Sequence, residues 1–163
     1  MGYELYALPV PIGGDLEEAG ETLLALLRTG HVRGPHSTEN KAKAAAVVTA
    51  LEIGCGFRPE PTGEAAGAAT GAWTRLAAAS GILATVAPGF VRIQLPFDWV
   101  GEVAGGHFER LFEALQRVVE ETGWQIYDPQ DAARVSVDAG GLQTTLDIYL
   151  SVMDQLRPGR SPA

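Results

Sequence analysis

The chain has 163 residues, and its 20 acidic residues against 12 basic ones give a formal net charge of −8. This balance argues against a nucleic-acid surface, because phosphate binding needs clustered basic residues and the only lysines are Lys41 and Lys43. A single cysteine excludes an internal disulfide. The 46% apolar and 20% charged fractions are typical of a globular chain, and we expect one domain, 1–163.

The apolar segments predict neither a leader peptide nor a membrane span. Residues 1–11 contain no basic side chain, which a signal peptide needs. The charge-free stretch between Arg75 and Arg92 is interrupted by Gly81 and Pro88, and it is too short to cross a bilayer. We expect a cytoplasmic protein that binds neither membrane nor nucleic acid.

The first half of the chain predicts one strand and two helices. Aromatic and aliphatic residues at 3–8 indicate a strand. Asp15 marks a helix start, where its carboxylate accepts from early backbone N–H groups, and the apolar stripe that follows ends at Gly30. The Ala-rich segment 41–53 predicts a second helix. Glycine, alanine and proline at about 54–72 indicate a long loop.

The second half of the chain contains the clearest periodicity. Apolar residues recur at helical spacing in 107–122, and Gly123 closes this helix. Pro88-Gly89 between two apolar runs predicts a hairpin. The expected elements are a short helical turn at 73–79, hairpin strands at 82–87 and 90–95, a strand at 124–127, a short edge strand at 134–137 and a helix at 142–156.

This order predicts an α+β fold. Treating the first two helices as one crossover gives a ferredoxin-like β-α-β-β-α-β sandwich with a helical insertion and an extra C-terminal helix. Right-handed crossovers would order the predicted strands fourth, first, third, second and would place the helices on one face of the sheet. The other face would then be uncovered, which suggests a possible homodimer.

Carboxylates follow two strands of this predicted sheet. Asp98 comes just after the third strand and Asp128 just after the fourth, so both would emerge at the same sheet edge, roughly 10 Å apart. Glu102 and Asp131 lie close to them in sequence. Such a cluster could bind a cation or work as an acid–base pair. The simpler alternative is that aspartates end strands and solubilise loop tips.

An aromatic residue, Trp99, lies among these acids in the loop 97–100. A partly exposed tryptophan there is typical of an interface anchor. The alternative is that Trp99 covers the start of the following helix. The candidate partner-binding or carboxylate site consists of Asp98, Trp99, Glu102, Asp128 and Asp131.

Other chemical signals are weak. The run Leu51-Glu-Ile-Gly-Cys-Gly56 resembles the glycine-rich motif of S-adenosylmethionine-dependent methyltransferases. Helical spacing precedes it, the prolines that follow disfavour a regular helix, and Asp98 is the one acidic residue between Ala65 and Trp99, which together favour a helix end. Cys55 has no recognisable base. His31, His36 and His107 do not supply the three or four ligands of a zinc site. We expect no cofactor, no metal and no catalytic residue.

Three short motifs carry a resemblance. They are Tyr3-Glu-Leu-Tyr6, the strand end Leu95-Pro96-Phe97, and Tyr127-Asp-Pro-Gln130 after an amphipathic helix. With them the chain resembles uncharacterised small bacterial proteins over most of its length. The resemblance implies no activity, ligand or site residue, but it implies a helix over 41–53.

These observations predict a non-enzymatic protein-interaction module of the immunity or accessory type. Its partner would be an unidentified protein that binds the acidic edge. The alternative is a metal-dependent or acid–base enzyme that uses the strand-end carboxylates.

Overall fold

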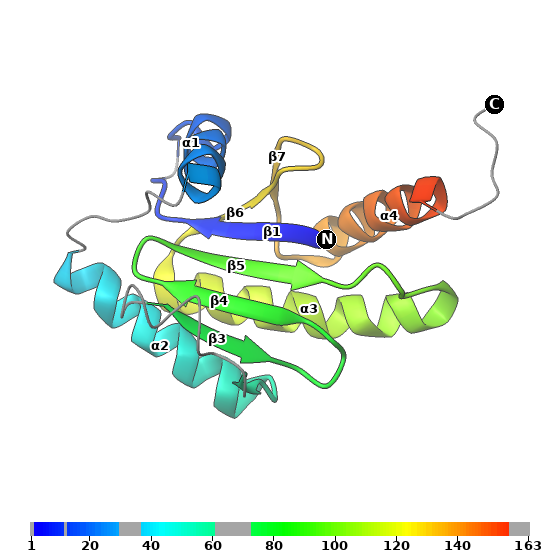
Figure 1. Ribbon diagram of the computed structural model, residues 1–163, viewed down its shortest axis with the longest axis horizontal. Coiled ribbons are helices and arrows are strands. Elements are labelled where there is room, and N and C mark those ends of the chain that lie inside the picture. Colours follow the sequence, from blue (N-terminus) through cyan, green and yellow to red (C-terminus); the bar gives the residue numbers. More distant parts are fainter. Residues whose placement is uncertain (1, 12, 30–36, 61–72, 157–163) are drawn as a thin grey trace.

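The computed structural model describes residues 2–11, 13–29, 37–60 and 73–156. Within these residues, seven strands form one sheet in the order β2-β3-β4-β5-β1-β6-β7, and neighbouring strands are antiparallel. The strands are β1 (Tyr3–Leu8), β2 (Arg58–Pro59), β3 (Thr74–Ala77), β4 (Leu83–Ala87), β5 (Phe90–Leu95), β6 (Gln125–Asp128) and β7 (Ala133–Val135). The helices are α1 (Leu16–Thr29), α2 (Thr38–Gly54), α3 (Gly101–Thr122) and α4 (Ala139–Leu156). The architecture is α+β, as predicted (Figure 1).

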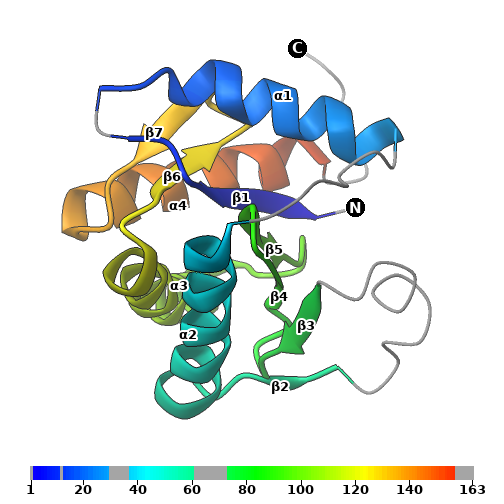
Figure 2. The ribbon, with the colours of Figure 1, turned by 90° about the vertical axis from the view of Figure 1, so that its left-hand side faces the viewer.

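The main core lies between one face of the sheet and the layer of α2, α3 and α4 (Figure 2). Alternation along β5 builds this face, because Val91, Ile93 and Leu95 are buried there while Arg92 and Gln94 point to the other face and are half-buried. The predicted amphipathic pattern of α3 is confirmed by its buried stripe, and the predicted stop by the glycine that follows the helix with a φ of 68°.

Helix α1 packs on the opposite face of the sheet (Figure 2). Its Leu16 and Leu23 join Tyr6, Phe90 and Tyr127 in a second, smaller core cluster. The expectation that α1 and α2 form one crossover, with all helices on one face, is therefore wrong. An apolar stripe shows that a helix packs on a sheet, but it does not say on which face.

The sheet is wider than the four predicted strands. Those strands lie side by side in the order β6-β1-β5-β4, while β2 and β3 extend one edge and β7 the other. The helical turn predicted at 73–79 is wrong, because Thr74 to Ala77 pair with β4 as a strand. The loop predicted at about 54–72 contains the short strand β2, and its residues 61–72 lie outside the described residues.

Helices α2, α3 and α4 begin earlier than the apolar pattern predicts, since their first turns are polar or glycine-rich. Ser37 caps α2, where its Oγ accepts from the Asn40 backbone N–H at 3.0 Å. Asp15 caps α1 in the same way, as predicted, with a 3.0 Å bond from the Glu18 N–H. Among the described residues, no helix is both long and apolar enough to span a membrane.

Candidate functional site

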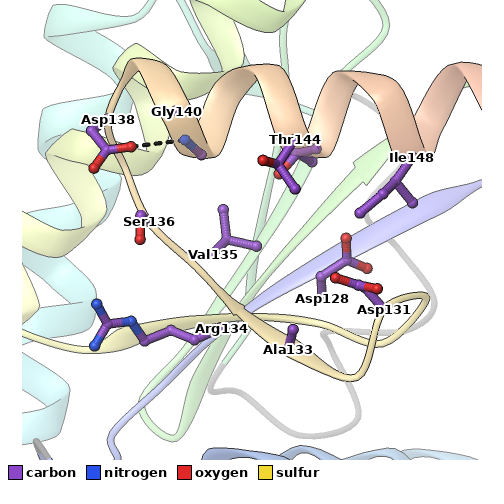
Figure 3. Close-up of a pocket in the computed structure, with 12 residues that line it drawn as sticks. Asp128, Asp131, Ala133, Arg134, Val135, Ser136, Asp138, Gly140, Thr144 and Ile148 are labelled. Carbon is purple, nitrogen blue, oxygen red and sulfur yellow. Dashed lines mark hydrogen bonds between the residues drawn. The ribbon is translucent and has the colours of Figure 1, made fainter.

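A pocket of about 360 Å³ lies between the β6–β7 hairpin and the start of α4 (Figure 3). Two residues of the predicted site, Asp128 and Asp131, line one end of it, beneath Ile148. The hydroxyl-bearing Ser136 and Thr144 also line the pocket. The guanidinium of Arg134 points away from the two aspartates. The carboxylates of Asp128 and Asp131 are therefore the charged groups at their end of the pocket.

Local sequence brings the start of α4 close to β7. The Asp138 carboxylate accepts from the Gly141 N–H at 2.7 Å and so caps α4. A Cβ at Gly141 would overlap the backbone carbonyl of Ser136, so this close approach requires glycine. At Gly140 the same Cβ would meet only the Asp138 carboxylate, at an ordinary 3.5 Å.

Asp128 is 1% exposed, and both of its carboxylate oxygens accept hydrogen bonds. The hydroxyl of Tyr3 donates to Oδ2, and the backbone N–H of Gln130 donates to Oδ1 at 2.8 Å. Burial raises the pKa of Asp128, and burial together with the bond to Asp128 raises the pKa of Tyr3. Asp128 thus ties the end of β6 to β1.

Two of the three motifs that carry the resemblance, Tyr3–Tyr6 and Tyr127–Gln130, meet each other in this region. Tyr6 pairs with Tyr127 across β1 and β6. With the Gln130 amide oriented so that its nitrogen faces the two acceptors beside it, that nitrogen donates to the Glu4 carbonyl at 3.2 Å and to Asp128 at 2.8 Å. We call these contacts, with the Tyr3–Asp128 bond, the β1–β6 clasp. Its contacts give both motifs a structural role.

The turn between β6 and β7 carries backbone strain. Ala132 has a φ of 48°, and it is the one non-glycine residue with a positive φ among those described. Asp131, beside it, is exposed at the rim of the pocket. Across the described residues, no group of three or more His, Cys, Asp or Glu side chains is placed to hold a metal ion.

Asp98, Trp99 and Glu102 lie elsewhere, at the connection between β5 and α3. The two acids are exposed, whereas Trp99 is 4% exposed, so the expected exposure of this tryptophan is wrong. Its indole N–H donates to the Ser80 carbonyl at 3.2 Å, and its ring stacks on His107 at 4.5 Å. Trp99 covers the start of α3, which was the alternative.

The exposed apolar side chains at this connection are aliphatic. Val100 is 48% exposed and Val103 59% exposed, and the carboxylates of Asp98 and Glu102 in the same short segment are exposed as well. We call these four residues the β5–α3 corner. The two valines were not predicted as site residues, because the prediction followed the aromatic side chain of Trp99, although both valines stand within two residues of Asp98 or Glu102 in the sequence.

Tyr149 of α4 lies between the corner and the clasp. Its hydroxyl donates to the Pro96 carbonyl at 2.5 Å and accepts from the Trp99 N–H at 3.3 Å. Its ring meets that of Tyr3 edge-on at 5.7 Å. Burial raises the pKa of Tyr149, and the charge of Asp98 acts in the same direction. The five predicted site residues thus divide into two groups, with buried tyrosines between them.

The weaker signals have structural explanations. Leu51 to Gly54 end α2, and the backbone N–H groups of Cys55 and Phe57 donate to the Leu51 carbonyl, which confirms the predicted helix end. Burial raises the pKa of the Cys55 thiol, which disfavours the reactive thiolate. His31 and His36 lie outside the described residues.

Comparisons with protein-family models, curated proteins and solved structures give no significant match.

Proposed function

We propose that this chain is a cytoplasmic, non-enzymatic protein-interaction module of the immunity or accessory type. Its partner binds at the β5–α3 corner. One observation carries this proposal: within residues 98–103 the aliphatic side chains of Val100 and Val103 and the carboxylates of Asp98 and Glu102 are all exposed. Exposed aliphatic groups with a charged rim are typical of a protein-binding surface.

A rigid support favours binding at this corner. Trp99 is buried directly between Asp98 and Val100, and its backbone and indole N–H groups both donate hydrogen bonds. Its ring also packs against Phe108 and Tyr149. A surface held in this way loses little conformational entropy when a partner binds, so more of the contact energy becomes affinity.

The charge of the corner defines the chemistry of the partner. Asp98 and Glu102 are exposed acids on a chain with a net charge of −8. Complementary potentials steer association and exclude partners of like charge. We therefore expect a protein surface that combines apolar side chains with lysine or arginine.

The contacts of Asp128 favour this role over the enzymatic alternative. An acid–base enzyme at the strand ends would need a carboxylate that is free to exchange a proton with a substrate. Both oxygens of Asp128 are already bonded, one to Tyr3 and one to the Gln130 N–H. The described residues also offer no set of metal ligands for the metal-dependent form of the alternative.

We also propose that β6, β1, β5 and β4 form a ferredoxin-like unit to which the other strands were added. The support is the order of these four strands within the sheet, together with the helix α3 that joins β5 to β6. In this proposal α1 is an addition on the second face of the sheet.

Affinity capture from an extract of the source cells tests the proposed interaction. The wild-type chain is compared with a Val100→Asp, Val103→Asp variant and with an Asp98→Lys, Glu102→Lys variant. Leu26→Asp is the matched control, because Leu26 is a 39% exposed aliphatic residue on α1, which packs on the opposite face of the sheet. We expect a stoichiometric partner that wild type and control retain and that both corner variants lose. A partner that both corner variants retain would contradict the proposal.

A further inference from the structure

Three arginines lie on the part of the sheet face that α1 leaves uncovered. Helix α1 packs on β1, β6 and β7, and Figure 1 and Figure 2 show no described helix over β3 and β4 on that side of the sheet. Strand pairing places one arginine from each of β2, β3 and β5 on this face. They are Arg58, Arg75 and Arg92. We call the part of this face that β2 to β5 form the arginine face.

Arg75, Thr85 and Arg92 form one row across three neighbouring strands. Thr85 of β4 pairs with Arg75 of β3 and with Arg92 of β5, and directly paired residues project to the same face. Arg92 in turn pairs with Tyr6, which belongs to the same apolar cluster as Leu16 of α1. The row therefore lies on the α1 side of the sheet, and two strand spacings of about 4.8 Å separate the Cα atoms of the two arginines.

Basic residues outnumber acidic ones on the arginine face, which reverses the balance of the chain. Arg58 pairs with Ala77, so it lies on the same face as Arg75, two positions before Ala77. Glu60 is the acid of this region, and its Oε2 is 2.9 Å from Nε of Arg75. Strands β3, β4 and β5 contain no acidic residue, whereas the whole chain has 20 acids against 12 bases. The arginine face is therefore a locally basic surface on an acidic chain.

Arg92 is half-buried and has no charge partner. Its Nε is buried and donates to no acceptor, and none of the ion pairs among the described residues includes it. The Glu4 carboxylate on neighbouring β1 accepts instead from the Tyr6 hydroxyl at 2.6 Å and from the Gln94 amide at 2.9 Å. Burial raises the pKa of Tyr6, and the adjoining Arg92 guanidinium acts in the opposite direction. A charged donor buried without an acceptor is costly, and an anion removes that cost.

Thr85 adds a hydroxyl between the two arginines. It is 2% exposed, and its side chain forms no hydrogen bond with another described residue. Glu60 offsets the charge of Arg75, so the unpaired charge of the row belongs to Arg92. The row thus presents a guanidinium fork and a hydroxyl at adjacent positions. Such a set of donors is suited to the oxygens of a phosphate or a carboxylate.

We propose that Arg92 and Thr85 bind an oxyanion, the phosphate or carboxylate group of a small molecule, on the arginine face. Arg92 donates to two oxygens through its planar fork, Thr85 donates its hydroxyl proton, and Arg75 and Arg58 attract the anion from the rim. Three arginines on a chain with a net charge of −8 suit a small anion and not a nucleic acid, whose binding neutralises many phosphates. The site shares no residue with the β5–α3 corner and does not rest on the proposed function.

NMR of the arginine Nε–H groups observes the proposed contact directly in the wild-type chain. Sodium phosphate and sodium acetate are titrated separately at neutral pH, and sodium chloride holds the ionic strength constant. We expect a saturable shift of the Arg92 Nε–H signal with at least one of the two oxyanions. Tighter binding of phosphate assigns a phosphate-bearing ligand, and tighter binding of acetate assigns a carboxylate-bearing one. The absence of a saturable shift with both anions would overturn the proposal.

A pair of glutamine variants locates the site. Arg92→Gln removes the charge and should raise the dissociation constant of the anion by at least about tenfold, which corresponds to the loss of a charge-assisted hydrogen bond. Arg110→Gln is the matched control, because Arg110 is exposed on α3, in the helix layer on the opposite face of the sheet, and it should bind like wild type. Equal affinities of these two variants would refute the site.

A second variant protects the test against misfolding of Arg92→Gln, which circular dichroism checks. The side chain of Arg75 is 33% exposed, so Arg75→Gln leaves the buried part of the face unchanged. We expect weaker anion binding in this variant, because the charge of Glu60 is then uncompensated beside the site. Anion binding in Arg75→Gln at wild-type affinity would remove Arg75 from the site.

Discussion

The two groups of carboxylates follow similar sequence patterns but have opposite environments. Asp128 ends β6, is buried, and is bonded to Tyr3. Asp98 follows β5, is exposed, and precedes the exposed Val100 by two residues. An aspartate just past a strand is thus a structural group where another strand supplies a buried hydrogen-bond donor. It is a surface group where the chain turns outward.

The stability of the β5–α3 corner should depend most strongly on its buried residue, Trp99. Replacing Trp99 by alanine removes its packing against Phe108 and Tyr149 and its bond to Ser80. We expect a loss of about 3–5 kcal/mol in the free energy of unfolding. Val103→Ala, on the exposed side of the same corner, should change it by less than about 0.5 kcal/mol. Urea denaturation measures both, and equal effects would show that Trp99 is not the anchor.

On the side of the pocket, the free energy of unfolding should depend on Gly141 but not on its neighbour Gly140. Gly141→Ala forces a Cβ against the Ser136 carbonyl and pushes α4 away from β7, which should cost about 1–3 kcal/mol. Gly140→Ala is the matched control, because its Cβ finds ordinary space. Thermal unfolding of the two variants is the measurement. A Gly141→Ala protein as stable as the Gly140→Ala protein would contradict the close approach.

Removal of one hydrogen bond of the β1–β6 clasp should lower the free energy of unfolding. Tyr3→Phe removes the donor to Asp128 and leaves a buried carboxylate oxygen without that partner. The expected loss is about 1–3 kcal/mol. Denaturation of this variant is the check, and an unchanged midpoint would mean that the bond contributes nothing to stability.

Asp128 should also impose a pH dependence on stability. Its pKa is raised in the folded state by burial, so the folded chain holds this proton more tightly than the unfolded chain. The contribution of Asp128 is therefore present below the ordinary carboxyl pKa of 3.8 and is lost as pH rises through the raised pKa. In Asp128→Asn this slope should disappear. Identical pH profiles of wild type and variant would rule out the raised pKa.

The smallest expected effect is an increase in the free energy of unfolding. Ala132 has a φ of 48°, where glycine has no steric cost. Ala132→Gly should stabilise the chain by about 0.5–1 kcal/mol, because relief of strain exceeds the added entropy of the unfolded chain. A destabilised Ala132→Gly variant in calorimetry would show that the turn is not strained.

Local patterns predicted the elements that local sequence controls. The stripe of α3, the alternation of β5 and the Asp15 cap each depend on residues within a few positions. The strand β3 was missed because its pairing with β4 decides its conformation. The face on which α1 packs is likewise a tertiary property.

The candidate site was predicted only in part, for the same reason. The burial of Trp99 depends on Tyr149, which is 50 positions away in sequence. The partner of Asp128 is Tyr3, 125 positions away. A single sequence shows that aspartates follow two strands, but it does not show which of them meets a buried tyrosine.

The central claim is that the corner binds a partner while Asp128 supports the fold. Two titrations of the captured partner test this claim most directly. One uses the double variant Asp98→Lys, Glu102→Lys and the other uses Asp128→Asn, both at a temperature where all chains are folded. We predict that the corner variant loses affinity by about tenfold or more and that Asp128→Asn binds like wild type. Undiminished binding by the corner variant, with binding lost in Asp128→Asn, would contradict the account.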